Sequence, residues 1–169
     1  MRPAVIFDLD GTLCDTTHRK HLLPENKSIT SDDWDNDLAK DAWREFHMWC
    51  GHDTLIHPVA EILYQYWIKN TKIIFCTARP FYVYDLTIGW ISKHIPGIKG
   101  FYNIYMREID DKRKSAILKL EMLEHIRKEY NVVCAFEDHP EAIKMFNDNG
   151  VLCLKPCISN NRFGELNAI

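Results

Sequence analysis

The sequence has no long apolar run, no excess of positive charge and no internal repeat. Its hydrophobic stretches fall well short of the ~20 residues of a membrane-spanning helix, and it opens without the layout of a signal peptide. A formal net charge of −3 excludes a surface that binds polyanions by charge alone. Low-complexity tracts and clear linkers are missing too. We therefore expect a soluble, cytoplasmic, single-domain protein without membrane contact or an obligate protein partner.

The six cysteines are scattered and do not suggest a disulfide framework. Cys76 and Cys134 lie inside apolar, strand-like runs, where a reduced thiol packs as a small hydrophobic side chain. This placement favours a reducing compartment. A local cluster of histidine and cysteine between His47 and His57 has the residue types of a zinc site, but its spacing matches no standard finger.

Hydrophobic residues make up 46% and aromatic residues 12% of the 169 residues, which is enough for a compact core. Apolar runs alternate with segments of helical periodicity. The pattern predicts strands over residues 4–7, 72–76, 102–106, 132–136 and 151–154, and helices over residues 31–49, 57–69, 80–94, 115–130 and 140–149. The expected fold class is therefore α/β, with right-handed crossovers and a parallel sheet covered by helices on both faces.

Residues 15–56 interrupt this alternation. Their first part is polar and predicts a loop, and apolar residues at helical spacing then follow a cap at Thr30 or Ser31. We expect this segment to form a small helical insert that covers the site in part. The expected domain core consists of about residues 1–14 and 57–156, and the polar tail that follows is expected along the surface.

The first predicted strand ends at a chemical site. Residues 4–7 form a continuous apolar run, typical of a strand covered on both faces, and lead into Asp8-Leu9-Asp10-Gly11-Thr12. Gly11 allows the chain to turn sharply. Two neighbouring carboxylates at a sheet edge are costly without a cation, and Mg²⁺ is the usual partner of oxygen-only ligands. The alternative is an acidic turn after an edge strand, so the motif needs support from the rest of the chain.

Two other predicted strands also end in polar residues. Thr77 follows the second strand, and Glu137 and Asp138 follow the fourth. Because the carboxyl ends of parallel strands meet at one edge, we expect these side chains beside Asp8 and Asp10. Their mutual repulsion is itself an argument for a bound divalent cation.

Helix periodicity selects one lysine for this site. Lys119 lies on the apolar stripe of its helix, so its stem faces the core, whereas Lys112 and Lys114 precede the helix. A lysine in that position needs an anion for its ammonium group, either the carboxylates or a phosphate held beside them. The alternative is a lysine at the helix border with its ammonium group in solvent.

Taken together, these residues resemble a known family. Asp8-Leu9-Asp10-Gly11-Thr12, Thr77, Lys119 and Glu137-Asp138 are similar, in this order and over nearly the whole chain, to the four motifs of the haloacid dehalogenase-like phosphohydrolases. Within that superfamily the sequence resembles the 3′-phosphatase domain of bacteriophage polynucleotide kinase-phosphatases. That family has counterparts of Arg19, Arg79 and Arg107.

The sequence also departs from this family. No segment resembles the kinase half, Ser115 stands where the family tends to have an aspartate, and Glu137 replaces the first of two aspartates. The segment between Thr12 and Lys72 is longer than in the best-known members. These departures bear on the substrate more than on the reaction.

The resemblance implies a Mg²⁺-dependent phosphomonoesterase that works through an aspartyl-phosphate. Asp8 would be the nucleophile and Asp10 the general acid and base. Thr77 and Lys119 would stabilise the phosphoryl group. The implied metal ligands are Asp8, Asp10 through its backbone carbonyl, Asp138, and Glu137 through a water molecule. The implied substrate-binding residues are Arg19, Thr77, Ala78, Arg79 and Arg107.

The expected substrates are nucleotide phosphates, either 3′-phosphate ends of DNA or RNA or free (deoxy)nucleoside monophosphates. A phosphatase for sugar phosphates or other small metabolites is an alternative. A non-catalytic phosphate-binding module is another, against which the intact Asp8 and Asp10 argue. The aromatic residues Trp34, Trp43, Phe46 and Trp49 either stack on a base or pack in the core.

Overall fold

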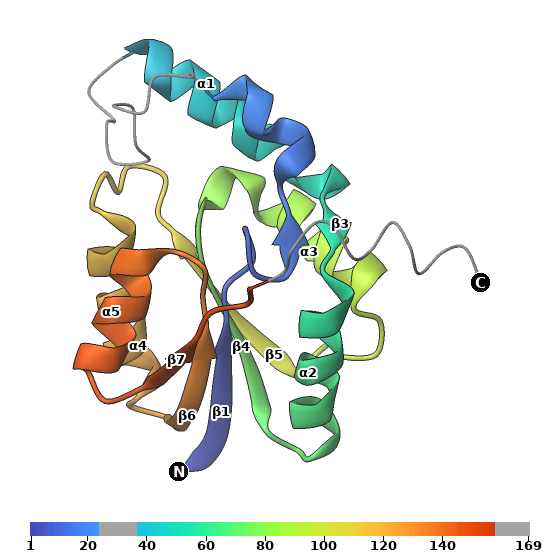
Figure 1. Cartoon of the computed structure of the whole chain (residues 1–169), viewed down its shortest axis with the longest axis vertical. Coiled ribbons are helices and arrows are strands. Elements are labelled where there is room, and N and C mark those ends of the chain that lie inside the picture. Colours follow the sequence, from blue (N-terminus) through green and yellow to red (C-terminus); the bar gives the residue numbers. More distant parts are fainter. Residues whose placement is uncertain (24–36, 158–169) are drawn as a thin grey trace.

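The structure is a computed structural model that describes residues 1–23 and 37–157. Within these residues, the main sheet has five parallel strands in the order β5-β4-β1-β6-β7 (Figure 1). The strands are β1 (Arg2–Phe7), β4 (Lys72–Pro80), β5 (Tyr102–Arg107), β6 (Tyr130–Phe136) and β7 (Leu152–Leu154). The expected α/β fold with a parallel sheet is confirmed.

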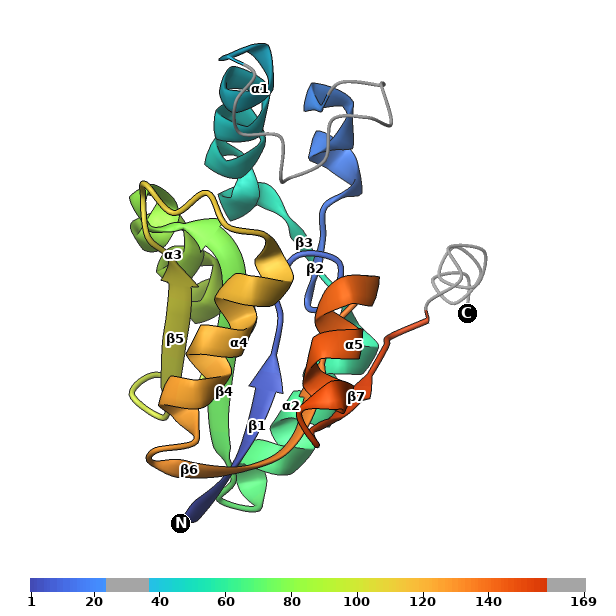
Figure 2. The same ribbon diagram turned by 90° about the vertical axis from the view of Figure 1, so that its left-hand side faces the viewer.

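Helices cover both faces of the sheet (Figure 2). One face packs against α2 (His57–Ile68) and α3 (Tyr84–His94), and the other against α4 (Ser115–Ile126) and α5 (Pro140–Asp148). Both α2 and α5 have a proline in the first turn, where its missing N–H costs no helical hydrogen bond. In the described part of the chain, no helix is both long enough and apolar enough to cross a membrane.

The central strand β1 shows why an apolar run folds this way. Val5 and Phe7 pack in the core layer under α2 and α3, whereas Ala4 and Ile6 pack in the layer under α4 and α5. Phe7 also stacks on Phe136 of β6, with ring centroids 4.7 Å apart. Burial of apolar surface stabilises by about 25 cal/mol per Å². A strand that is apolar on both faces therefore belongs in the middle of the sheet.

The described segment between β1 and α2 adds smaller elements. A short antiparallel pair joins β2 (Cys14–Asp15) to β3 (Thr54–Leu55), and α1 (Asp37–Met48) lies beyond the carboxyl ends of the sheet strands (Figures 1 and 2). The expected loop contains a 3₁₀ helix, Thr17–Leu22. The amide of Thr17 donates to the carboxylate of Asp15 at 2.9 Å, which fixes the start of that turn. The division into core and insert stays a prediction.

Several element bounds differ from the sequence expectation. Strand β4 continues through Pro80, so the helix expected from residue 80 begins at Tyr84, after the 3₁₀ helix η3 (Phe81–Val83). Helix α4 ends at Ile126 rather than Tyr130, because Tyr130 pairs with Arg2 and starts β6. The expected helix caps at Thr30 and Ser31 and the tail from residue 158 lie outside the described residues.

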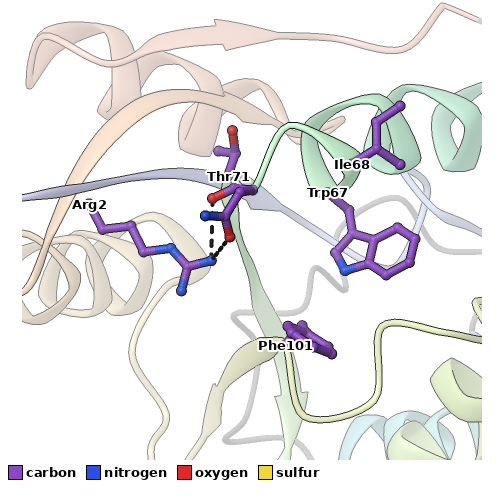
Figure 3. Close-up of a pocket in the computed structure, with 6 residues that line it drawn as sticks. Arg2, Trp67, Ile68, Thr71 and Phe101 are labelled. Atoms are coloured by element: carbon purple, nitrogen blue, oxygen red, sulfur yellow. Dashed lines mark hydrogen bonds between the residues drawn. The ribbon is translucent and has the colours of Figure 1, made fainter.

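One pocket lies at the amino-terminal edge of the sheet, where β1 and β4 begin (Figure 3). Its volume is about 330 Å³. The residues that line it are Arg2, Trp67, Ile68, Asn70, Thr71 and Phe101. The guanidinium group of Arg2 donates to the side-chain and main-chain oxygens of Asn70 at 2.7 and 3.2 Å. The pocket lining contains no carboxylate and lies opposite the edge where the sequence places the chemistry.

Candidate active site

Three carboxylates meet at the carboxyl-terminal edge of the sheet. Asp8 follows β1, and Glu137 and Asp138 follow β6, which pairs directly with β1. Each of the three offers an oxygen within 4.8 Å of the other two. The amide of Asp8 donates to the carbonyl oxygen of Phe136 at 3.0 Å, so the two strand ends are joined at this point. The sheet pairing therefore brings together acids that are about 130 residues apart in the chain.

The ammonium group of Lys119 lies in the middle of this cluster. It donates to Asp8 Oδ1 at 2.7 Å and to Glu137 Oε2 at 2.5 Å. The side chain is only 2% exposed, because α4 presents its stem to the core. Helix periodicity selects Lys119 among the nearby lysines, and the structure places its ammonium group against the carboxylates rather than in solvent. Its catalytic role stays a prediction.

The cluster carries more negative than positive charge. Burial raises the pKa of Asp8 to about 7, Glu137 adds to this rise, and Lys119 opposes it. Burial and the charge of Asp8 also raise the pKa of Asp138, to about 6. Burial alone would lower the pKa of Lys119, but Asp8 and Glu137 hold it well above its usual value. One ammonium group does not compensate three carboxylates, so the donor set suits a hard divalent cation such as Mg²⁺.

Gly11 leaves the space that Asp138 occupies. The φ angle of Gly11 is +82°, and a Cβ atom built there would lie 2.2 Å from Asp138 Oδ2. A side chain at this position is therefore excluded twice, by the backbone conformation and by the carboxylate. The turn after β1 is shaped to let the acidic side chain after β6 reach the cluster.

Replacing Gly11 by alanine is expected to displace Asp138 and to weaken Mg²⁺ binding about tenfold or more, as loss of ligand orientation does elsewhere. Gly100→Ala is the matched control, because Gly100 has a φ of +80° and nothing within 4 Å of an added Cβ atom. Titration calorimetry with Mg²⁺ compares the two variants. An equal loss of Mg²⁺ affinity in the two variants would mean that backbone strain, rather than displacement of Asp138, accounts for the effect.

A second charged cluster adjoins the first. Arg19 Nη2 donates to Asp10 Oδ1 at 2.6 Å, and Arg79 donates to the same oxygen from Nε at 3.0 Å and from Nη2 at 2.5 Å. Asp53 accepts from Arg19 Nε at 2.7 Å and from Arg79 Nη2 at 2.6 Å. Both arginine side chains are fully buried. Two carboxylates and two guanidinium groups therefore form a neutral quartet of Asp10, Arg19, Asp53 and Arg79.

This quartet controls the state of Asp10. Burial would raise the pKa of Asp10, but the charges of Arg79 and Arg19 hold it well below its usual range. Asp10 is thus ionised, and it keeps about a quarter of its side-chain surface exposed. The neighbouring His47 is buried, and burial lowers its pKa to about 3. The predicted roles of Arg19 and Arg79 in substrate binding and of Asp10 in proton transfer stay predictions.

Asp53 is the site residue that sequence reasoning missed. Its carboxylate is buried and also accepts from His18 Nε2 at 2.9 Å, while its carbonyl oxygen accepts from Trp90 Nε1 at 2.7 Å. It stands in a short polar stretch with no periodicity, so no local pattern marks it. The sequence predicted substrate binding for Arg19 and Arg79 and left open which anions compensate them in the free protein. Two buried guanidinium groups beside Asp10 need a second anion, and Asp53 supplies it.

The other predicted site residues occupy different positions. Thr77 is buried in β4, and its Oγ1 accepts from the amide of Arg79 at 3.2 Å. Ala78 offers its carbonyl oxygen to Arg107 Nε at 3.2 Å. Arg107 also donates to the carbonyl oxygens of Asp111 and Arg113, at 3.0 and 2.6 Å. Through Asp111 and Arg113 these contacts bind Arg107 to the backbone of the loop before α4, and its predicted contact with substrate stays a prediction.

The predicted aromatic residues of the insert divide into buried and exposed groups. Phe46 is buried under the guanidinium group of Arg19, which lies 4.0 Å from the ring centroid. Trp43 packs edge-on against Phe46 at 5.3 Å. Trp49 is 48% exposed, and Trp34 lies outside the described residues. Core packing therefore accounts for Phe46 but not for Trp49.

This combination of fold and site defines a class. The parallel sheet, with Asp8 after the central strand and an acidic pair after its neighbour, has the architecture of a haloacid dehalogenase-like phosphatase. A haloacid dehalogenase-like family protein from Streptococcus pneumoniae superposes with a TM-score of 0.62 at 14% identity, covering 91% of this chain and 84% of its own. At that identity the likeness concerns the fold alone.

Comparison with known families narrows the class. The family model described as the polynucleotide kinase PNKP phosphatase domain matches residues 33–161, and the chain belongs to this family. The matched range begins after Asp8 and Asp10. The assignment of these two residues therefore depends on their motif and on the geometry described above.

Two relatives are similar over most of this chain. A protein of Autographa californica nuclear polyhedrosis virus, assigned as a bifunctional polynucleotide kinase/RNA ligase, is 32% identical over 146 residues, covering 86% of this chain and 18% of the relative. A chain in the structure of a Pnkp1/Rnl/Hen1 complex is 25% identical with a TM-score of 0.66, covering 92% of this chain and 46% of that chain. This chain thus spans less than half the length of either relative.

Proposed function

We propose that this protein removes the terminal phosphate from 3′-phosphorylated nucleic-acid ends, with Asp8 as the nucleophile. The observation that carries the proposal is the cluster of buried Lys119, Asp8 and Glu137 with the partly buried Asp138, beside two buried arginines. Phosphoryl transfer requires chiefly an oriented nucleophile and fixed positive charge. The similarity to proteins described as a polynucleotide kinase/RNA ligase and as members of a Pnkp1/Rnl/Hen1 complex supports nucleic acid as the substrate class.

In the proposed reaction, an oxygen of Asp8 attacks phosphorus in line with the leaving 3′ oxygen. Lys119 keeps Asp8 oriented at 2.7 Å and offsets the charge that nucleophile and phosphate share. Asp10 is ionised while Arg19 and Arg79 donate to it, so it can protonate the leaving oxygen only after these arginines turn to the substrate and its carboxylate takes up a proton. After that transfer, Asp10 is again a carboxylate and takes a proton from the water that hydrolyses the aspartyl-phosphate. Thr77 would donate its hydroxyl hydrogen to a phosphoryl oxygen, while its oxygen atom accepts from the amide of Arg79.

Asp8, Asp138 and the backbone carbonyl of Asp10 would hold Mg²⁺, with Glu137 acting through water. Bound there, the ion would supply charge neutralisation for the phosphate and for the crowded carboxylates. The direct contact of Glu137 with Lys119 supports an indirect role of this glutamate in metal binding.

A panel of substrates tests the proposed function. It contains 3′- and 5′-phosphorylated DNA and RNA oligonucleotides, 3′- and 5′-mononucleotides and sugar phosphates, each with Mg²⁺ and with EDTA. We expect phosphate release to be fastest from the 3′-phosphorylated oligonucleotides and to stop in EDTA. Release restricted to sugar phosphates would refute the nucleic-acid substrate, and absence of release from every compound would favour a phosphate-binding module.

Replacing Lys119 by alanine is expected to lower kcat/KM by about 100-fold or more, because fixed charges of this kind are worth about 3 kcal/mol each. Lys112→Ala is the matched control, since Lys112 is exposed in the loop before α4 and is expected to change the rate little. The same comparison applies to Lys114→Ala. A larger loss in either control than in Lys119→Ala would contradict the assignment of the catalytic lysine.

A further inference from the structure

Exposed aromatic rings gather on the segments that surround the candidate active site. Trp49 follows α1, Phe81 and Tyr82 belong to η3, and Tyr84 begins α3. Trp49 is 48% exposed and Phe81 is 49% exposed, and Tyr82 and Tyr84 are exposed as well. We call these four residues the aromatic surface. Large aromatic rings normally contribute to the core, so a group of exposed rings marks a binding surface.

The aromatic surface belongs to segments that contact one another. The hydroxyl group of Tyr82 lies 3.4 Å from Nδ1 of His47 on α1. Phe81 and Tyr84 stack with ring centroids 5.1 Å apart and an angle of 27° between their planes. Leu86 of α3 lies against Gly51, two residues after Trp49. The rings thus border the junction of α1 with η3 and α3.

Short chain segments and buried contacts connect the aromatic surface to the charged residues of the site. Phe81 and Tyr82 follow Arg79, whose guanidinium group binds Asp10, by two and three residues. On the side of α1, the ring of His47 meets the ring of Phe46, which lies 4.0 Å from the guanidinium carbon of Arg19. A molecule held at Asp8 and Asp10 by its terminal phosphate therefore has this surface within reach of its next residues.

The chemistry of the surface favours nucleic-acid bases. Every base has a flat face that stacks on an aromatic ring, whereas a sugar phosphate or a phosphate ion has none. Burial raises the pKa of Tyr82, and the charge of Arg44 on α1 opposes this rise, which is consistent with a positive charge on the α1 side of the rings. Sites that bind single-stranded nucleic acid combine aromatic side chains, which stack on the bases, with cationic side chains, which pair with the phosphate backbone.

Building on the proposed function, we infer that the aromatic surface is a stacking site for the unpaired bases that precede the 3′-phosphate of a single-stranded substrate. This site makes the enzyme prefer a strand end to a free nucleotide. Stacking on Phe81 and Trp49 holds the last bases while the terminal phosphate occupies the cluster around Lys119.

The test compares two substrates of the whole chain: a thymidine hexanucleotide with a 3′-phosphate and thymidine 3′-monophosphate. We expect the wild type to have a higher kcat/KM for the hexanucleotide. Phe81→Leu and Trp49→Leu, which keep an apolar side chain but remove the ring, are expected to lower the ratio of the two values about fivefold or more each, mainly through KM of the hexanucleotide. Ile68→Ala is the control, because Ile68 is an exposed apolar side chain, 63% exposed, at the opposite edge of the sheet.

Two results would overturn the stacking site. A ratio near one in the wild type would show that preceding bases are not held, and an equal loss for both substrates in the leucine variants would indicate a structural role. Fluorescence anisotropy with a labelled thymidine dodecanucleotide without phosphate gives a second measurement that does not need turnover. If the wild type releases no phosphate but binds this strand more tightly than the leucine variants, the proposed reaction fails and the stacking site stands. Absence of binding removes the stacking site as well.

Discussion

Replacing Asp8 by asparagine is expected to stop phosphate release while the protein stays folded. Only the nucleophilic oxygen is exchanged for an amide, and loss of a catalytic nucleophile lowers kcat by a factor of at least about 1000 in other enzymes. The fold is expected to survive because Lys119 keeps Glu137 as a partner at 2.5 Å. Removing one of three crowded carboxylates also relieves repulsion, so the melting temperature without Mg²⁺ should not fall.

Steady-state phosphate release and thermal melting, each with and without Mg²⁺, check this expectation. Mg²⁺ should raise the melting temperature of the wild type and raise that of Asp8→Asn less, because the variant has lost one ligand. Asp148→Asn serves as the control for an aspartate changed at an exposed position. Activity of Asp8→Asn near that of the wild type would exclude Asp8 as the nucleophile. Unfolding of Asp8→Asn would show instead that the cluster needs all three carboxylates.

The sequence predicted the core of this fold because its strands are apolar on both faces. Each expected strand of the main sheet exists, since the runs around Val5 and Cys134 have no stable alternative to burial between two helical layers. The bounds were less accurate. Where α4 ends depends on the pairing of Tyr130 with Arg2, a contact between residues 128 positions apart that no local pattern contains. The hydrophobic periodicity of the sequence predicts the order of strands and helices, whereas tertiary contacts determine the residues at which they end.

The same distinction applies to the candidate site. The meeting of Asp8, Lys119 and Asp138 could be predicted from the pattern of strands and helices. Two strand ends fix the positions of the aspartates, and one helical stripe fixes that of the lysine. The partners of Asp10 could not be obtained this way. They come from the insert and from the end of β4, where charge compensation rather than periodicity selects Arg19, Asp53 and Arg79. Asp53 was missed for this reason.

Replacing Asp53 by asparagine is expected to destabilise the protein by about 3–5 kcal/mol, the usual cost of removing one member of a buried ion pair. Asp53 joins Arg19 of the insert to Arg79 of the sheet, and its loss leaves two buried guanidinium groups that share the carboxylate of Asp10. For a chain of this length, a loss of that size lowers the melting temperature by roughly 10 °C.

Urea unfolding of Asp53→Asn and of Asp148→Asn measures the difference directly. Asp148 pairs with Lys144 at 2.5 Å, but both side chains are exposed, and an exposed pair contributes at most about 1 kcal/mol. The two substitutions are chemically identical and differ in burial, so the gap between them reports what burial adds to an ion pair. The smallest difference that we expect between the two losses of stability is about 2 kcal/mol, from at least about 3 for the buried pair and at most about 1 for the exposed pair. A difference of that size or larger would support the quartet as the link between insert and sheet. Equal stabilities would mean that solvent or a rearranged side chain compensates the two arginines.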